Sequence, residues 1–302
     1  MLDYPSIAAV AAVVREGTFE RGAAALGITP SAISQRVRGL EERLGAVLVV
    51  RGNPCEPTEL GRTLCAHLDR VRLLEFDIAP ALGSGAVAVG TPLAIRIAVN
   101  ADSLATWLPV AIAAFARNAG VSLEVMLEDE TCTADRLRSG EVMAAVTDDP
   151  TPIAGFRTSA LGGLRYMACA SPDFMARQFP GGVTGAALAR APMLRFDRKD
   201  FLQHRWAQEH CGVELMGPTH WVPSAQAFID LALRGVGWGL QPSSLVEGHI
   251  AAGRLVKLPP ALPLVVQLYW MVARLHAAPL QRLSDEVRHA AQGFLTIPDP
   301  SG

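Results

Sequence analysis

Residues 1–62 place apolar side chains at the spacing of short amphipathic helices, with turn-forming residues between them. Apolar positions recur over residues 5–15, and Gly17 ends this segment. Thr18 has the side chain of a helix N-cap and precedes a second helical segment over residues 19–26. The pattern therefore predicts short helices joined by tight turns at the start of the chain.

A third helix is predicted after the turn at Gly27, with Thr29 as its N-cap and Pro30 at its first position. Its apolar residues recur three and four positions apart, which indicates one buried face. The residues of that apolar stripe are Ile33, Val37, Leu40 and Leu44. The polar residues off the stripe are Ser31, Ser34, Gln35, Arg36 and Arg38. The opposite face of this helix is therefore predicted to be polar and basic.

A short β-branched run over residues 46–51 and a turn over residues 52–54 follow the third helix. Thr58 is then placed to cap a long helix that runs to about residue 78. Apolar side chains lie along one side of that helix, which predicts pairing with a partner helix. Residues 80–92 are rich in Gly, Ala and Pro and contain no charge, so they predict a linker and a domain boundary.

From residue 93 onward, strands alternate with helices in the order expected of a mainly parallel sheet. The first set of these elements covers residues 95–99, 103–118, 122–127, 132–139 and 142–146. The second set covers residues 165–170, 225–234, 239–240, 264–272 and 280–294. The pattern therefore predicts an α/β multidomain protein that begins with a small helical domain.

The composition is that of a globular protein and does not point to one obvious partner. The length of 302 residues predicts two or three compact units, and the 50% of hydrophobic and 19% of charged residues are typical of a globular chain. The formal net charge is −2, so any nucleic-acid-binding surface must be local. The five cysteines form no CxxC pair and are interpreted as reduced thiols of a cytoplasmic protein. We find no export signal, and the longest uncharged apolar run, near 104–116, is shorter than the roughly 20 residues of a membrane span.

The second and third predicted helices, joined by the turn at Gly27, have the form of a helix-turn-helix. In that motif the start of the second helix enters the major groove, where Ser, Gln and Arg side chains bind base edges and phosphates. Arg51 is placed like a wing, and free N–H groups at helix N-termini also bind phosphate oxygens. The candidate DNA-binding residues are Thr18, Thr29, Pro30, Ser31, Ser34, Gln35, Arg36, Arg38, Arg51 and Thr58. Periodicity alone leaves open the alternative of a structural three-helix module with a solvated basic face.

The run GTFERGAAALGITPSAISQRVRGLEERLGAVLVVR (17–51), continued by TELG (58–61), resembles the winged helix-turn-helix of LysR-type transcriptional regulators. The helix lengths, the turn, the LEERLG exit and the arginine-ended strand all match together. The order of long helix, linker and two-lobed α/β region extends the resemblance over the whole chain. One departure is NPCEP (53–57), where the family usually has basic or polar residues at the wing.

This resemblance implies a particular domain organisation and a particular set of partners. The expected partners are a double-stranded DNA operator, a second copy of the chain in a homodimer or dimer of dimers, and RNA polymerase, with no membrane. The family is not expected to carry out enzyme chemistry, and no cofactor is implied besides a small-molecule effector. The implied domains are a winged helix-turn-helix over 1–62, a dimerisation helix and hinge over 58–92, and a periplasmic-binding-protein-like effector domain over 93–302, with lobe I over 93–161 and 268–302 and lobe II over 162–267.

Polar residues gather where the predicted strands of the α/β region end, which is where open α/β sheets bind ligands. The first group opens a helix whose N–H groups suit a carboxylate, and acidic residues after the next two strands suit a cation. The candidate effector-binding residues are Asn100, Asp102, Ser103, Glu128, Asp129, Asp148 and Ser224. Each of them also has an ordinary explanation as a helix cap, a turn residue or part of a solvated loop.

Four loop segments resemble the ArgP/LysG branch of the family, whose members respond to basic amino acids and control their export. These segments are NADSLATW (100–107), LEDETCT (127–133), FPGGVT (179–184) and VPSAQAF (222–228). The resemblance implies lysine or arginine as the effector, and an amino-acid export or transport gene as the target.

Two other functional classes remain as alternatives. A periplasmic-type solute-binding protein would share the α/β region but would not bind DNA. An enzyme built on the same region would need a set of catalytic residues, which we do not find in the sequence. The aromatic residues Phe174, Phe179, Phe196 and Trp206 are interpreted as core residues.

Overall fold

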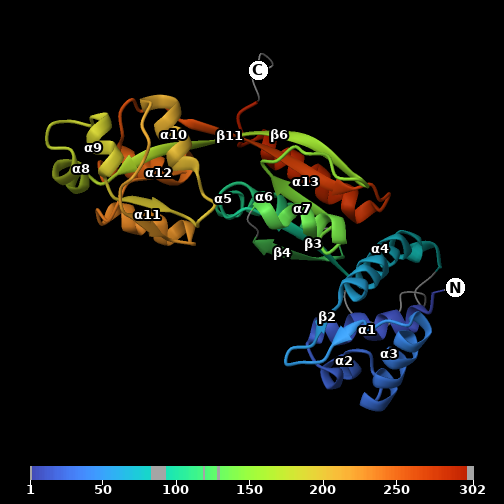
Figure 1. The fold of residues 1–302 in the computed structure, drawn as a ribbon. Coiled ribbons are helices and arrows are strands. Elements are labelled where there is room, and N and C mark those ends of the chain that lie inside the picture. Colours follow the sequence, from blue (N-terminus) through green and yellow to red (C-terminus); the bar gives the residue numbers. More distant parts are fainter. Residues whose placement is uncertain (1, 83–92, 118–119, 128–129, 298–302) are drawn as a thin grey trace.

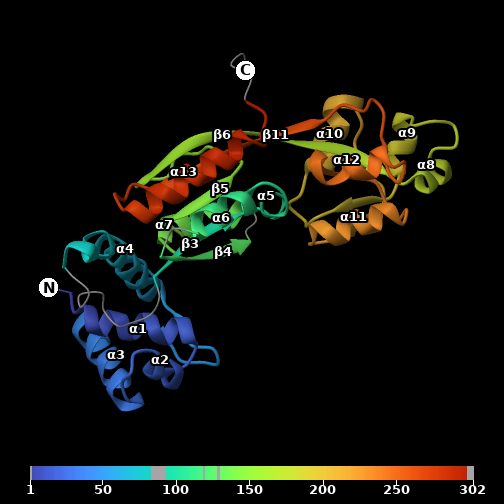
Figure 2. The same cartoon turned by 180° about the vertical axis from the view of Figure 1, so that it is seen from behind.

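The computed structural model describes residues 2–82, 93–117, 120–127 and 130–297. An N-terminal helical region leads into the long helix α4 (Glu59–Leu82) and then into an elongated α/β region of two lobes (Figure 1). The lobe drawn mostly in yellow and orange, lobe II, lies farthest from the N-terminal helices. Lobe I, drawn mostly in green and red, lies between them in both views (Figure 2). This arrangement confirms the predicted fold class.

The N-terminal region contains the predicted helices and a two-stranded wing. Its elements are α1 (Tyr4–Glu16), α2 (Phe19–Ala25), α3 (Pro30–Leu44), β1 (Val49–Val50) and β2 (Glu56–Pro57). Gly17 ends α1 in the left-handed conformation, with a φ of 75°. The Thr18 and Thr29 side-chain oxygens accept hydrogen bonds from Arg21 N and Ala32 N, both at 3.2 Å. The predicted helix stop and both predicted N-caps are therefore confirmed.

Two predictions for this region are wrong in detail. The strand expected over residues 46–51 is reduced to β1, because the side chain of Glu41 accepts the backbone N–H groups of Leu48 and Val49 at 2.8 and 3.3 Å. The apolar stripe of α3 does not reach Leu44, which is 41% exposed. The last turn of α3 therefore extends beyond the core that buries its earlier turns.

A small hydrophobic core joins the N-terminal helices, the wing and the start of α4. Its fully buried side chains include Ile7, Val10 and Ile33. The first turn of α4 closes this core at Gly61, where an added Cβ would lie 2.1 Å from the carbonyl oxygen of Leu48. Only a residue without a side chain allows this close approach. The helix-turn-helix, the wing and the start of α4 are therefore packed as one unit.

A seven-stranded sheet runs through the α/β region in the order β10-β6-β11-β5-β3-β4, with β9 also paired to β6. In lobe I, β3 pairs in parallel with both β4 and β5, as predicted. Every other pair in this sheet is antiparallel, so the prediction of a mainly parallel sheet is wrong. The strands are β3 (Ala94–Val99), β4 (Ser122–Leu127), β5 (Ala144–Thr147), β6 (Phe156–Ala170), β9 (Gly239–Pro242), β10 (Val256–Lys257) and β11 (Leu264–Ala273).

The physical reason for this difference is the length of β6 and β11. Strand β11 pairs along its whole length with residues 156–166 of β6, and both strands cross from one lobe to the other. The strand predicted over residues 165–170 is only the second half of β6. Because both strands belong to both lobes, they form the hinge on which the lobes are held.

Helices cover the sheet in both lobes, and one predicted helix is divided. The helix expected over residues 103–118 is split into α5 and α6 at Thr106 and Trp107. Pro109 in the first turn of α6 cannot donate a hydrogen bond to residue 105 and would clash with it in a continuous helix. The remaining elements are α5 (Ala101–Ala105), α6 (Leu108–Ala116), α7 (Glu130–Ser139), α8 (Pro172–Gln178), α9 (Gly185–Arg190), β7 (Met193–Arg195), α10 (Leu202–Cys211), β8 (Thr219–Trp221), α11 (Ala225–Leu233), α12 (Ser243–Ala251) and α13 (Ala278–Gln292).

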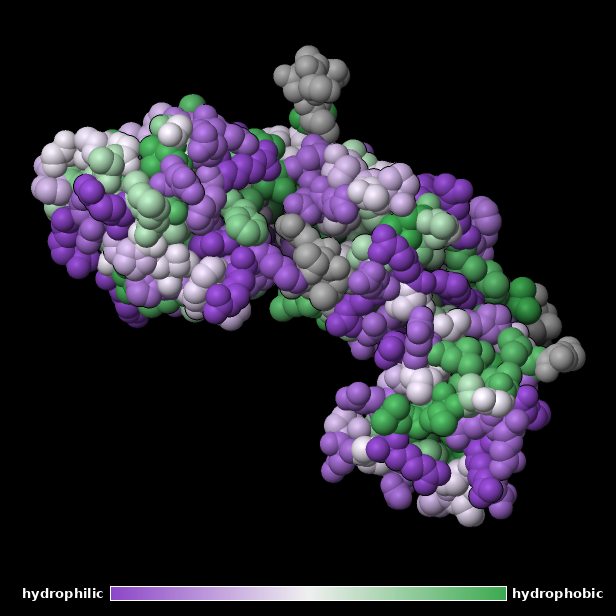
Figure 3. Space-filling model, viewed as in Figure 1, coloured by the Kyte–Doolittle hydropathy of each residue, from purple (hydrophilic) through white to green (hydrophobic). Residues whose placement is uncertain are grey.

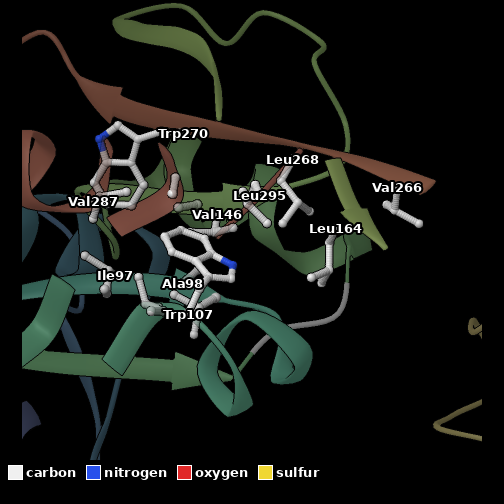
Figure 4. Packing of buried hydrophobic residues seen from close by; sticks show 14 of the residues in the cluster. Ile97, Ala98, Trp107, Val146, Leu164, Val266, Leu268, Trp270, Val287 and Leu295 are labelled. Atoms are coloured by element: carbon white, nitrogen blue, oxygen red, sulfur yellow. The ribbon is translucent and has the colours of Figure 1, made fainter. Parts of the chain in front are cut away.

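The main hydrophobic core lies between the sheet and these helices. Figure 4 shows the rings of Trp107 and Trp270 among aliphatic side chains of the sheet, including Ile97 and Val146. The indole N–H of Trp270 donates to the hydroxyl of Ser284 at 3.0 Å, so the buried polar atom is satisfied. The core thereby fixes the end of α5, because Trp107 lies two residues after that helix and is 1% exposed.

Helix α4 packs along lobe I as well as against the N-terminal core. Leu73 on α4 is fully buried in the main core, and the carboxylate of Asp77 accepts the backbone N–H of Ala278 at 2.9 Å. Asp69 on α4 pairs with Arg96 of β3 and lies 3.9 Å from Arg15 of α1. One largely buried carboxylate therefore links the N-terminal region, the long helix and lobe I.

The residues predicted as linker fall only partly within the described chain. Residues 80–82 complete α4, and residues 83–92 lie outside the described residues. Among the helices of the described chain, none is long and apolar enough to cross a membrane.

Candidate functional site

A cavity of about 530 Å³ lies between the two lobes. Lobe I contributes Asn100, the start of α5 and Asp148 after β5, and lobe II contributes the loop after β7, the start of α11 and strand β9. Tyr166 and Val266, on the crossing strands β6 and β11, line it as well. The cavity is therefore bounded by both lobes and by the strands that connect them, so a ligand inside it would affect how the lobes close.

Asp102 is the most perturbed carboxyl group that lines this cavity. Its Oδ2 accepts a hydrogen bond from the Tyr166 hydroxyl at 2.7 Å. Burial raises the pKa of Asp102 to about 6; the bond from Tyr166 lowers it and the nearby charge of Asp200 raises it further. The pKa of Tyr166 is raised well above its ordinary value by burial and by the surrounding carboxylates Asp102, Asp200 and Asp148. Carboxylates from both lobes therefore lie close enough to influence the same tyrosine.

The lining of the cavity is acidic overall. Among the described residues that line it, the acidic side chains are Asp102, Asp148, Asp197 and Asp200, and the basic ones are Lys199 and Arg205. Arg205 is already paired with Glu209, at 2.7 Å. This distribution favours a cationic ligand over an anionic one.

The structure brings several of the predicted effector-binding residues together. Asn100, Asp102 and Asp148 line the cavity. Asn100 also caps α5, with its side-chain oxygen accepting the N–H of Ser103 at 2.8 Å. Ser103 itself is fully buried beneath the lining, and no described residue hydrogen-bonds its hydroxyl. These residues therefore combine a capping role with a position at the cavity.

The other predicted effector-binding residues are placed differently. Ser224 caps α11 by accepting the N–H of Ala227 at 3.3 Å, while its neighbours Pro223 and Ala225 line the cavity. Its capping role is confirmed, and its contact with an effector stays a prediction. Glu128 and Asp129 lie outside the described residues.

The sequence pattern did not predict that the loop over residues 196–201 in lobe II belongs to the site. This loop supplies Asp197, Lys199 and Asp200 to the cavity, and the DRKD segment within it has a charge density that could have marked it. Phe196 was interpreted as a core residue, but it is half-buried and lines the cavity. The loop was not predicted as part of the site because nothing in its own sequence pattern indicates that it lies opposite the end of β3.

This loop is held firmly by hydrogen bonds and by a buried arginine. The carboxylate of Asp200 accepts the backbone N–H groups of Phe196 and Leu202 at 2.8 and 3.1 Å. The Arg195 guanidinium lies 4.8 Å from the Phe201 ring centroid and 4.7 Å from that of Trp221, a cation–π arrangement on two rings. Burial lowers the pKa of Arg195. The charged rim of lobe II is therefore pre-organised.

The second candidate surface is the exposed face of α3. Ser31, Gln35 and Arg36 are exposed there, and Ser34 is half-buried. Pro30 is exposed at the first position of α3, immediately after the Thr29 cap. These side chains lie at or near the N-terminal half of α3, the part of a recognition helix that reaches base edges.

Three other predicted DNA-binding residues already have partners within the chain. Arg38 forms an exposed ion pair with Glu42 at 2.8 Å. The Arg51 guanidinium lies 5.0 Å from the centre of the Phe19 ring, which holds it against α2. Thr58 caps α4 by accepting the N–H of Gly61 at 3.1 Å, so its predicted capping role is confirmed.

Comparison with known proteins identifies both halves of the chain. Residues 6–62 match the family described as bacterial regulatory helix-turn-helix protein, lysR family. Residues 92–292 match the family described as LysR substrate binding domain. The chain belongs to the LysR family of regulators. The helix-turn-helix reading of the N-terminal residues is therefore confirmed over that of a purely structural module.

Individual LysR-type relatives are similar over nearly the whole chain. The transcriptional regulator ArgP of Pseudomonas aeruginosa is 46% identical over 273 residues, which cover 89% of each chain. The crystal structure of ArgP from Mycobacterium tuberculosis matches with a TM-score of 0.82 and 38% identity, over 99% of this chain and 100% of that one. Full-length LysG of Corynebacterium glutamicum with bound effector Arg matches with a TM-score of 0.70 and 34% identity, over 98% of this chain and 100% of that one. These relatives confirm the predicted ArgP/LysG resemblance.

Proposed function

We propose that this LysR-type regulator binds lysine or arginine between its two lobes and that the bound amino acid changes how the N-terminal helices engage an operator. The observation that carries the proposal is the buried carboxylate of Asp102 in an acidic interlobe cavity. A basic amino acid brings two cationic groups and one carboxylate to such a site. The relative whose structure holds Arg as its effector supports the same assignment.

The cationic end of the ligand is matched by Asp102. Tyr166 occupies only one of its carboxylate oxygens, and an ionised carboxylate can accept several hydrogen bonds. An ammonium or guanidinium group placed there forms a charge-assisted hydrogen bond in a site shielded from water, where such bonds are strong. The same cation relieves the repulsion between Asp102 in lobe I and Asp200 in lobe II, which favours closure of the lobes.

The movement of the lobes on closure is transmitted to the DNA-binding surface through β3 and α4. The Asp69 side chain holds Arg96 on β3 and lies beside Arg15 on α1, so movement of lobe I acts directly on the N-terminal region. Transmission through such a packed junction is the usual route by which a small shift at an effector site moves a distant element. The contacts around Asp69 therefore couple lobe closure to the position of the N-terminal helices.

On the DNA side, Ser31, Gln35 and Arg36 enter the major groove of an operator half-site. The chain acts as a dimer, and as a dimer of dimers on a full operator. Figure 3 shows hydrophobic surface around α4 and the N-terminal helices. On α4, Leu74 and Ile78 are 43% and 54% exposed. These side chains are available to pack against a second α4. The target is an amino-acid export or transport gene, with RNA polymerase as the further partner.

A thermal-shift screen of the purified protein with each of the twenty amino acids tests the effector assignment. A ligand that binds only the folded state raises the melting temperature, by an amount that grows with ligand concentration. We expect a shift with lysine or arginine and none with glutamate or leucine. A screen in which neither basic amino acid gives a shift would contradict the proposal.

Salt-dependent retention on DNA tests the regulator assignment separately. A protein that contacts phosphates with arginine side chains loses affinity steeply as salt rises, whereas a solute-binding protein is not retained at all. The matched comparison is residues 93–302 alone, which lack the helix-turn-helix. Equal retention of the full chain and this fragment would contradict DNA binding through α3.

A further inference from the structure

Gln241 is a buried polar residue on strand β9, and the residues next to it in that strand are apolar. It lies on β9 between Leu240 and Pro242, is 2% exposed and contributes to the lining of the interlobe cavity. Its side-chain nitrogen Nε2 is buried and has no hydrogen-bond partner within the part of the chain that the structure describes. A buried donor without a partner costs free energy, so its position at the cavity needs an explanation.

The start of α11 lies on the same wall of the cavity as Gln241. The two elements pack closely because Gly239 has no side chain: an added Cβ there would be 2.5 Å from the ring of Phe228 on α11. Phe228 and Ala225, both on α11, line the cavity together with Gln241. Gln241 and the first turn of α11 therefore line the same cavity.

The first turn of α11 offers further donors of the same kind. This helix has nine residues, and its first backbone N–H groups, at Ala225 and Gln226, have no carbonyl partner within the helix. Ser224 caps only the N–H of Ala227. Together with the positive end of the helix dipole, these N–H groups favour a carboxylate.

We propose that Gln241 determines specificity for an amino acid by donating its side-chain N–H to the α-carboxylate of the effector, beside the N-terminus of α11. The proposal rests on the proposed function and adds which lobe binds which end of the ligand. Lobe II binds the carboxylate, and Asp102 of lobe I binds a cationic group. A basic amino acid then bridges the lobes, whereas an amine without a carboxylate engages only lobe I.

A neutral donor is the residue type that this position requires. The cavity is acidic, so a ligand carboxylate is repelled unless donors lie close to it. An arginine or lysine at position 241 would supply a donor but would also compete with the effector for Asp102. Glutamine supplies the hydrogen bond without this competition.

Calorimetric titration of the full-length protein with L-arginine and with agmatine, which is arginine without its carboxylate, tests the proposal. We expect the wild-type protein to prefer arginine by at least tenfold. Gln241→Leu keeps the approximate size of the side chain but removes the donor. We expect it to weaken arginine about tenfold and leave agmatine unchanged, so that the preference is lost. Gln208→Leu, on the exposed face of α10, is the matched control and should keep the wild-type preference.

A second variant keeps the test decisive if Gln241→Leu does not fold, which thermal unfolding reveals. Gln241→Glu has almost the same shape but places a negative charge beside the ligand carboxylate. It should bind agmatine at least as well as arginine. If either folded variant retains the wild-type preference for arginine, the role of Gln241 is overturned while the proposed effector stands. If the wild-type protein binds neither arginine nor lysine, both the effector assignment and this inference are overturned.

Discussion

The polar side chains on the face of α3 are exposed to solvent, whereas those that line the interlobe cavity are largely shielded from it. On α3, Ser31, Gln35 and Arg36 project from a helix whose cap and buried stripe are already complete. In the cavity, Gln241 is 2% exposed and Asp102 is only partly exposed, and their hydrogen-bonding capacity is only partly used. A surface for a large charged partner can stay solvated until it binds, whereas side chains already held in place around a cavity lose less conformational freedom when a small ligand binds.

The largest expected effect comes from Asp69 on α4, which links α1 of the N-terminal region to β3 of lobe I. Replacement of Asp69 by Asn leaves Arg96 and Arg15 without their shared carboxylate, and we expect a loss of about 3 kcal/mol in the free energy of unfolding. Urea denaturation measures this loss. Glu42→Gln, which breaks the exposed pair with Arg38, is the control and should cost less than about 0.5 kcal/mol. Equal losses of unfolding free energy in the two variants would show that the ion pairs of Asp69 do not stabilise the contact between the N-terminal region and lobe I.

The next largest effect is expected for a change at Asp102, which should weaken ligand binding in the cavity without weakening DNA binding by α3. Asp102→Asn keeps the shape of the side chain and its bond with Tyr166 but removes the negative charge. We expect affinity for lysine or arginine to fall by about 2 kcal/mol, roughly thirtyfold, with operator affinity in the absence of effector unchanged. Calorimetry and gel-shift titration measure the two affinities. The control is Asp173→Asn on the exposed α8 helix, and an equal loss of ligand affinity there would remove Asp102 from the site.

The pH dependence of ligand binding follows from the raised pKa of Asp102. Because this pKa rises from 3.8 to about 6 on folding, the carboxyl group favours the folded state most below pH 3.8 and loses this contribution as the pH rises to about 6. A cationic ligand needs the ionised form. Affinity for arginine should therefore fall up to about tenfold for each pH unit below 6 and level off above pH 7. The profile should flatten in Asp102→Asn, and a profile that is the same in both proteins would contradict the assignment.

The smallest effect is expected at the exposed surface of α3. Gln35→Ala removes a side chain that can bond a base edge without disturbing the buried stripe of Ile33, Val37 and Leu40. We expect operator affinity to fall by about 1–2 kcal/mol and affinity for random DNA to stay the same. Parallel gel-shift series on the two DNAs measure this difference. Equal losses on both would mean that Gln35 does not read sequence.

The N-terminal region could be predicted well because its signals are local. Thr18, Thr29 and Thr58 act on N–H groups three residues later, so each cap is visible in a short stretch of sequence. The errors in this region arose where distant groups intervene. Glu41 binds the backbone of β1 from α3, and Leu44 extends past the core.

The cavity was predicted only where a residue directly follows a strand of lobe I. Asn100, Asp102 and Asp148 meet that rule and line the cavity. Tyr166 and Gln241 were missed because an isolated polar residue within an apolar strand has no local pattern that distinguishes a ligand contact from a satisfied core residue. Whether such a residue contacts a ligand depends on which lobe its strand faces.

The helix-turn-helix and the strands at the start of lobe I could be inferred from the linear sequence, because caps, periodicity and turn residues act over a few positions, and the family followed from the resemblance of residues 17–51 and 58–61. The antiparallel pairing of β6 with β11, the position of the charged loop over 196–201 and the absence of a described partner for Gln241 Nε2 were decided only by the tertiary structure. Each of these brings together groups distant along the chain. Desolvation and charge interaction depend on distance in space, so they arise only once the lobes have folded against each other.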